Sequence, residues 1–304
     1  LLLTHNVSRT TLLSGKLIGV ITALAIPLLL GVILQAVIIQ LGGVTFTTGD
    51  MARLGLSLLF TILYVSVFSL LGLLLSSIFR HSTTSIVTGL LIWALLVVVI
   101  PGLSSLFAGD VVDIATREQA YENANNSLNE AYKQYTEKHP NMQKGYSGHW
   151  SPGEPLERAL VIADAWSGVI NEYRNAQIRQ VLAARKLSLI SPTAAYQQGL
   201  ESIAESGIFH YRNFLKQVRA FKREQRQFLL DKYPFSTRWF YPWTSAGPED
   251  RQKHAELGKV EIQLRDVPRF QERSLSLSEN VSESLLYFSV MIFSALLLYM
   301  TTVI

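Results

Sequence analysis

The chain has 304 residues, of which 49% are hydrophobic and only 16% are charged, and it contains no cysteine. A soluble domain carries about 25% charged residues, so the composition excludes a fully soluble or a disordered protein. The formal net charge of +4 is too small and too dispersed for a nucleic-acid-binding face. The absence of cysteine excludes disulfides, thiolate zinc sites and cysteine nucleophiles.

Four apolar segments are long enough to cross a bilayer, which takes about 20 mostly apolar residues. They cover residues 17–41, 54–79, 85–107 and 285–304, and none of them contains a charged side chain. The few polar residues of the chain cannot wrap four such runs as buried core helices. The sequence therefore predicts an all-α membrane protein with four visible transmembrane helices.

The short connections between these segments predict the orientation. Residues 1–16 and 80–84 carry basic residues and no acid, whereas the connection 42–53 has Asp50 against Arg53. The positive-inside rule places the two basic connections in the cytoplasm and residues 42–53 outside. With four spans, residues 108–284 also lie outside, and residue 304 lies inside.

Residues 108–284 are polar and long enough for a domain with its own core. Composition and apolar spacing predict four helices, at residues 110–139, 156–189, 191–205 and 208–232, the third starting with Ser191 as N-cap and Pro192 in its first turn. We expect the last helix to pack through Phe214, Val218, Phe221 and Phe228. Residues 259–266 are the one segment that suggests a strand.

A search for reactive chemistry finds only weak patterns. The chain lacks a phosphate-binding loop and the common zinc-protease and serine-hydrolase motifs. His139 and His149 share one polar loop, and Glu279 and Glu283 share one helical face, but loop residues and an exposed helical face are the simpler interpretations. No span contains a charged residue, which disfavours a proton or ion relay.

Three further features of the sequence concern the spans and the polar segment. The second span holds hydroxyl residues that serve either helix packing or a translocation route, namely Ser57, Thr61, Ser66, Ser69, Ser76 and Ser77. Pro101-Gly102 should bend or break the third span. The aromatic residues in 238–243 either cover a core or anchor the chain at the membrane surface.

The first 19 residues resemble the cytoplasmic segment of ABC-2-type transporter permeases. That family shows a pattern like L-L-x-x-P-V-S-R-x-x-[IL]-[LV]-x-G-K before an apolar span. The matching positions are Leu2, Leu3, Val7, Ser8, Arg9, Leu12, Leu13, Gly15 and Lys16, while Asn6 stands where many members have proline. The order of the spans, with a large insertion before the last one, is also similar to a subgroup with an extracytoplasmic helical domain.

The resemblance implies the transmembrane permease subunit of an export-type ABC transporter in a bacterial or archaeal cytoplasmic membrane. Members generally have six spans, so two would precede Leu1. The implied partners are a separate ATP-binding cassette ATPase, which carries ATP and Mg, and a second permease copy or paralogue. No cofactor, metal, catalytic residue or nucleic acid is expected on this subunit itself.

A permease without a nucleotide site needs a cytoplasmic element that receives work from the ATPase. Residues 1–16 suit this role as a short helix with one apolar face that ends at Gly15-Lys16. The predicted coupling residues are Leu3, Thr4, His5, Asn6, Val7, Ser8 and Arg9. The alternative for Arg9 is that it only obeys the positive-inside rule.

The alternative function is a non-transporting membrane-anchored protein whose external helices bind a ligand or partner. That reading requires no ATPase and no ordered segment 1–16. The spans suggest no substrate more specific than an amphiphile or a peptide.

Overall fold

The computed structural model describes residues 8–139, 154–232 and 264–303, and these residues are helical with short connections. They contain no strand, which confirms the predicted all-α fold. Residues 259–263, most of the segment that suggested a strand, lie outside the described residues, and Leu264–Asp266 (η5) is a 3₁₀ turn. The chain divides into two compact units, one of residues 1–111, 180–211 and 274–304, the other of residues 112–179 and 212–273.

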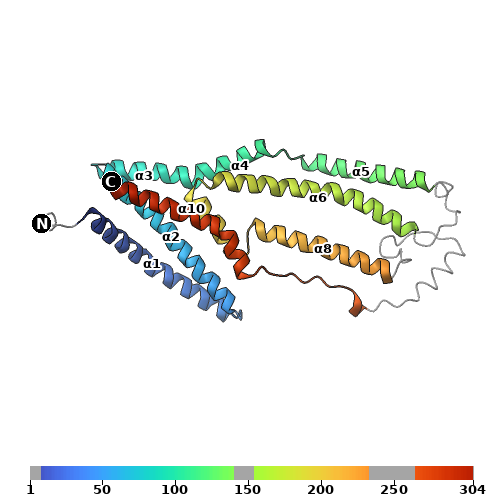
Figure 1. Ribbon diagram of the computed structural model, residues 1–304, viewed down its shortest axis with the longest axis horizontal. Coiled ribbons are helices and arrows are strands. Elements are labelled where there is room, and N and C mark those ends of the chain that lie inside the picture. Colours follow the sequence, from blue (N-terminus) through green and yellow to red (C-terminus); the bar gives the residue numbers. More distant parts are fainter. Residues whose placement is uncertain (1–7, 140–153, 233–263, 304) are drawn as a thin grey trace. The chain divides into compact units, whose positions relative to one another are not determined.

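The first unit contains the apolar helices (Figure 1). They are α1 (Arg9–Leu41), α2 (Thr48–Ile78), the run of α3 (Ser82–Ala94), η2 (Leu95–Val99) and α4 (Ile100–Val111), and α10 (Leu277–Val303). In the described part of the chain, these four are long and apolar enough to cross a membrane. Their apolar side chains are largely exposed, which water would not tolerate and a lipid environment favours. The protein is therefore a membrane protein.

Local sequence signals explain where the apolar helices begin. Thr47 and Asp50 form a reciprocal capping box at the start of α2. Ser276 and Glu279 do the same for α10, because the Glu279 carboxylate accepts the Ser276 amide at 2.8 Å and the Ser276 hydroxyl accepts the Glu279 amide at 3.3 Å. This cap is the role that the structure gives to Glu279, one of the two glutamates that the sequence singled out.

The prediction was that Pro101-Gly102 bends or breaks the third apolar helix, and the helix does not break there. The helix continues from Ser82 to Val111, and it adjusts by one π-helical turn, η2, directly before Pro101. A π turn accommodates the missing proline N–H by shifting the hydrogen-bond register, so that Ile100 donates to Leu95.

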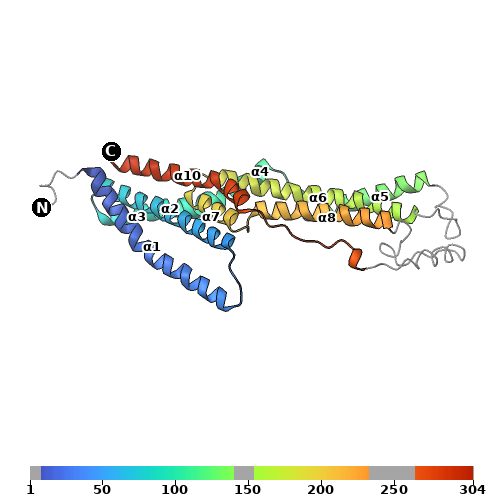
Figure 2. The same cartoon turned by 60° about the horizontal axis from the view of Figure 1, so that its bottom comes forward.

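A short helix, α7 (Pro192–Ile203), also belongs to the first unit (Figure 2). It packs against α2 and α10, although the sequence placed residues 191–205 within the polar segment 108–284. Ser191 caps it and Pro192 occupies its first turn, as predicted. The core of this unit lies where the three helices meet and consists of Phe60, Val67, Ala195, Tyr287 and Met291.

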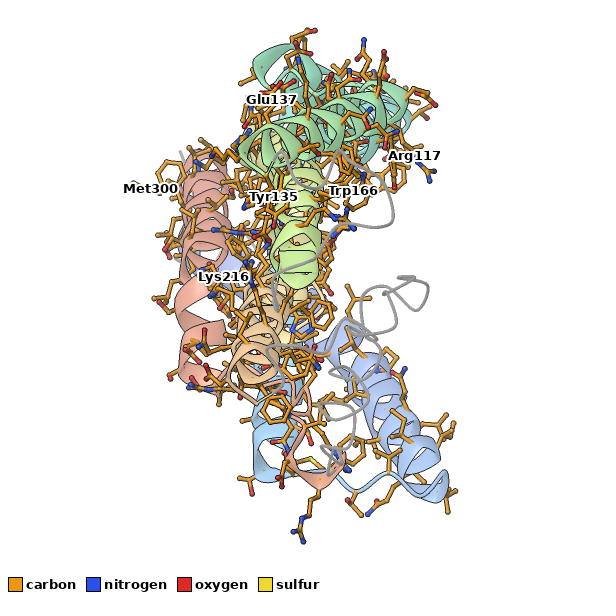
Figure 3. The ribbon with its side chains drawn as sticks, turned by 90° about the vertical axis from the view of Figure 1, so that its right-hand side faces the viewer. Arg117, Tyr135, Glu137, Trp166, Lys216 and Met300 are labelled. Carbon is orange, nitrogen blue, oxygen red and sulfur yellow. The ribbon has the colours of Figure 1, made fainter. Side chains whose placement is uncertain are left out.

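The second unit is built from α5 (Arg117–Lys138) and from most of α6 (Glu154–Ser188) and α8 (Ile208–Lys232). The sequence predicted one helix over 110–139, but residues 112–116 interrupt it and a Thr116–Gln119 capping box starts α5 anew. Trp166 of α6, labelled in Figure 3, packs edge-on against Tyr121 of α5 with ring centroids 6.2 Å apart.

The packing face predicted for α8 is confirmed at two of its residues. Phe214 and Phe221 contact the same ring, Phe270, with centroids 5.8 and 5.5 Å apart. The polar face of α8 reaches α6 instead, where Arg219 donates to Asn175 at 2.9 Å and Arg226 donates to Asp164 at 2.5 Å.

Candidate functional site

The structure describes two of the seven predicted coupling residues, Ser8 and Arg9. Leu3, Thr4, His5, Asn6 and Val7 lie outside the described residues. Ser8 is the N-cap of α1, since its hydroxyl accepts the Thr11 amide at 3.2 Å, and Arg9 is the first residue of that helix. Ser8 therefore starts the helix, and the coupling role of residues 3–9 remains a prediction.

The helix that Arg9 begins does not end at Gly15-Lys16, contrary to the prediction. It runs without interruption to Leu41, because a glycine inside a helix costs only about 1 kcal/mol and removes no hydrogen bond. Arg9 therefore begins a helix that continues into the first span and contains Pro27.

Helix α7 packs closely against the membrane-spanning helices α2 and α10. Phe60 of α2 is fully buried, and its ring lies 4.2 Å from Phe288 of α10 and 5.8 Å from Tyr196 of α7, centroid to centroid. Tyr64 stacks on Tyr196 at 4.3 Å. The Tyr196 hydroxyl also lies 2.9 Å from the Thr61 hydroxyl, so α7 is held by both apolar and polar contacts.

Gly199 makes this close approach of α7 to α2 possible. A Cβ at that position would lie 2.3 Å from Cε1 of Phe60, well inside contact distance. Gly199 is buried, and the chain offers no room for the aromatic ring to retreat because Phe60 is enclosed on all sides. Gly199 is therefore part of the contact between α7 and α2, and the sequence alone did not single it out.

A partly buried ion pair connects the end of α7 to α2 and α10. Arg53 donates to the Glu205 carboxylate at 2.6 Å and to the Leu275 carbonyl at 3.2 Å. Asn280, only 1% exposed, donates to the same Glu205 oxygen at 2.8 Å. We call Arg53, Glu205 and Asn280 the Glu205 cluster. It connects three segments that are far apart in the sequence.

The backbone of Glu205 is in an unusual conformation. Its φ is +54°, the one positive value at a non-glycine residue in the described chain. Ser206 donates to Glu201 and Glu205 donates to Ser202, at 3.0 and 3.4 Å, which is the hydrogen-bond pattern of a helix C-terminus that usually places glycine here. Such strain persists where surrounding contacts impose it, and the Glu205 cluster supplies those contacts.

The N-terminal end of α7 is tied to the third span by Ser191. Its hydroxyl donates to the Leu96 carbonyl in the π turn and accepts the Ala194 amide at 3.3 Å. The carbonyl of Leu96 needs this donor, since Ile100 bonds Leu95 and Pro101 has no N–H to offer. The proline that the sequence noted as a helix breaker thus creates the acceptor that Ser191 uses.

The last turns of α6 are joined to α7 by a second polar set. Arg185 pairs with Glu201, and Gln198 donates to the Ser188 hydroxyl at 2.9 Å and to the Arg185 carbonyl at 3.2 Å. Glu201 and Glu205 both lie at the negative end of the α7 dipole, an unfavourable place for a carboxylate. Arg185 and Arg53 compensate for this placement, one from each side of the turn.

Several other candidate residues have structural partners, and some lie outside the described residues. In the second span, Thr61 contacts Tyr196, while Ser66, Ser69 and Ser77 donate to carbonyls of their own helix. His139 stacks on Tyr135 with ring centroids 4.2 Å apart. His149 and the aromatic residues in 238–243 are not among the described residues.

The comparison with protein families gives one match. Residues 1–245 match the sequence model of a family described as ABC-2 family transporter protein. The match covers the first three spans, α7, α8 and the segment that holds the motif of residues 1–19. No curated protein and no solved structure matches the chain.

Proposed function

This chain belongs to the ABC-2 family of transporter proteins, and from that premise we propose that it is the permease subunit of an export-type ABC transporter, driven by a separate ATPase. The observation that carries the proposal is the family match over residues 1–245 together with four helices able to span a membrane. The family component lies in the membrane and is not itself catalytic. ATP and Mg then bind to the partner ATPase, and a second permease copy or paralogue completes the route.

We propose that residues 3–9 form the coupling element. Arg9 places a planar, permanently charged group at the start of a helix that continues through the first span, so a carboxylate of the ATPase can bind it through two hydrogen bonds. Val7 and Leu3, four residues apart, supply an apolar contact if the segment is helical. A movement of the ATPase would then displace α1.

We propose further that residues 112–179 and 212–273 face the extracytoplasmic side. We also propose that α7 couples the conformation of these residues to that of the membrane-spanning helices. The support is connectivity and packing. The chain passes from α6 into α7 and then into α8, and α7 is fastened to α2, α10 and the third span by the contacts described above.

The double variant Val7→Asp with Arg9→Glu tests the coupling element. The complex with the ATPase should lose substrate-stimulated ATP hydrolysis, because the variant reverses the charge and removes the apolar contact. Insertion of the spans and the fold of the second unit should be unchanged. The matched control is Lys16→Glu, which reverses a charge on the same helix two turns further along.

Normal ATP hydrolysis by an assembled complex of the double variant would show that residues 3–9 are not the coupling element. Failure of the wild-type chain to co-purify with any ATPase would favour the membrane-anchored binding protein instead.

A further inference from the structure

The first unit has an amphipathic groove along α2 and α10. One end adjoins Arg9, which also belongs to the proposed coupling element, and the other end adjoins Leu96, Ile190 and Pro192 at the start of α7. A hollow of about 550 Å³ lies where α1 begins and where α2 and α10 end, and Arg9, Ser77, Thr301 and Thr302 provide its polar lining. A second hollow of about 200 Å³ adjoins it at Leu297 and Leu298, which line both. The lining of the second hollow is apolar and includes Phe68, Leu71 and Phe293.

The register of the two helices makes these hollows one continuous groove. On α2 the lining residues run from Val67 to Ile78, and on α10 they run from Phe293 to Thr302. At 1.5 Å per residue these stretches are about 14 to 16 Å long. Half of the hydrocarbon core of a bilayer is about 15 Å thick, so the groove has the length of one leaflet's acyl chains.

The polarity of the groove changes from one end to the other. Arg9 is the one charged side chain among the lining residues, and it lies at the end with the three hydroxyl groups. Its full charge and the positive end of the α1 dipole outweigh the partial negative charges at the C-terminal ends of α2 and α10. The acidic residues of α10, Glu279 and Glu283, lie near the opposite end of that helix.

We propose that this groove binds an anionic phospholipid from the surrounding leaflet, with its phosphate at Arg9 and one acyl chain along α2 and α10. A phosphate accepts hydrogen bonds from a guanidinium in a fork geometry, and the hydroxyl groups of Ser77, Thr301 and Thr302 make this end of the groove polar. The rings of Phe68 and Phe293 and the side chains of Leu297 and Leu298 contact the chain. Arg9 also belongs to the proposed coupling element. Lipid binding requires no ATP hydrolysis, so the purified chain without the ATPase tests it separately.

Photolabelling of the purified chain in phosphatidylcholine nanodiscs tests the site. The probe is phosphatidic acid with a diazirine in one acyl chain, compared with phosphatidylcholine that carries the same chain. We expect the phosphatidic acid probe to label peptides of residues 67–78 and 293–302 about fivefold more than the other probe, the worth of one basic residue at a membrane surface. Arg9→Gln should abolish this difference, and Arg9→Lys should retain most of it.

Filling the groove is the second arm of the test. Leu298→Trp should block labelling by both probes. The control is Leu296→Trp, at a side chain that is 57% exposed and does not line the groove, and this variant should leave the labelling unchanged. Equal labelling by the two probes, or labelling that survives Leu298→Trp, would overturn the proposal. A disulfide between two copies of a Leu298→Cys variant would also overturn it, because a second copy would then occupy the groove.

Discussion

At the scale of single residues, the most informative position is Glu205. A left-handed backbone costs a non-glycine residue about 1–2 kcal/mol, yet glycine stands two residues away at Gly207 and not at the turn itself. The side chain explains the choice, since the Glu205 carboxylate is the shared acceptor of Arg53 and Asn280. The hydrogen bonds by which the Glu205 carboxylate connects α2 and α10 to α7 therefore stabilise the fold by more than the strained backbone costs.

The two contributions at Glu205 separate in a pair of variants. Glu205→Ala loses the carboxylate and keeps the strain, whereas Glu205→Gly loses the carboxylate and relieves the strain. We expect both to be less stable than the parent protein, and Glu205→Gly to be the more stable of the two by about 1 kcal/mol. Unfolding in detergent micelles titrated with dodecyl sulfate measures the difference, and equal stabilities would show that the turn is not strained.

The contact between Gly199 and Phe60 gives a second prediction. Gly199→Ala places a methyl group where the Phe60 ring lies, and overpacking of this kind costs about 1–3 kcal/mol. Gly72→Ala is the matched control, because a Cβ at Gly72 meets nothing within 4 Å. The same titration should show a large loss for the first variant and none for the second.

A compensating change sharpens this prediction. Phe60→Leu makes room for the new methyl group, so the double variant Phe60→Leu with Gly199→Ala should be more stable than the sum of the two single effects. Additive losses would place the two residues in separate environments and contradict the packing of α7 on α2.

At the scale of elements, the attachment of α7 to the third span depends on one hydroxyl. Ser191→Ala removes both the cap of α7 and the donor to the Leu96 carbonyl. We expect a loss of about 1 kcal/mol from the cap and a further 1–3 kcal/mol from the unsatisfied buried carbonyl. Thr116→Ala, which removes only a cap from α5, is the control.

Unfolding measured for both variants distinguishes the two contributions. A loss at Ser191 no larger than the loss at Thr116 would mean that the Leu96 carbonyl has another donor. In that case α7 would be fixed to α2 and α10 alone.

Sequence patterns predicted the elements better than their contacts. Apolar length located the four membrane helices, and Ser191-Pro192 located the start of α7, because these signals are local. The restart of α5 at Thr116 was overlooked within a run of good helix formers. The π turn before Pro101 was not foreseen, since it depends on a donor from Ser191, ninety-five residues away.

The packing of α7 on α2 and α10 could not be predicted from the sequence for the same reason. Residues 191–205 are amphipathic, and nothing local indicates whether their apolar face meets a soluble core or a membrane helix. The pairing of Arg53 with Glu205 spans 152 positions, and neither residue stands in a motif. The short motif at residues 1–19 indicated the family, which the match over residues 1–245 bears out.

At the scale of the whole molecule, the account assigns its parts to opposite sides of a membrane. In the proposed function, the coupling element and the 80–84 connection face the ATPase, and residues 112–179 and 212–273 face away from it. Along the chain, three apolar helices lie between the coupling element and residue 112, and one lies between the 80–84 connection and residue 112. The absence of cysteine provides a clean background in which this arrangement can be measured.

The most direct measurement is the labelling of single cysteines with a maleimide that cannot cross membranes. Thr83→Cys lies in the exposed first turn of α3, and Glu137→Cys lies on the exposed side of α5 (Figure 3). In spheroplasts, Glu137→Cys should react at once, and Thr83→Cys should react only after the cytoplasmic face has been opened. Reaction of both cysteines from the same side, or in the reverse order, would contradict the account.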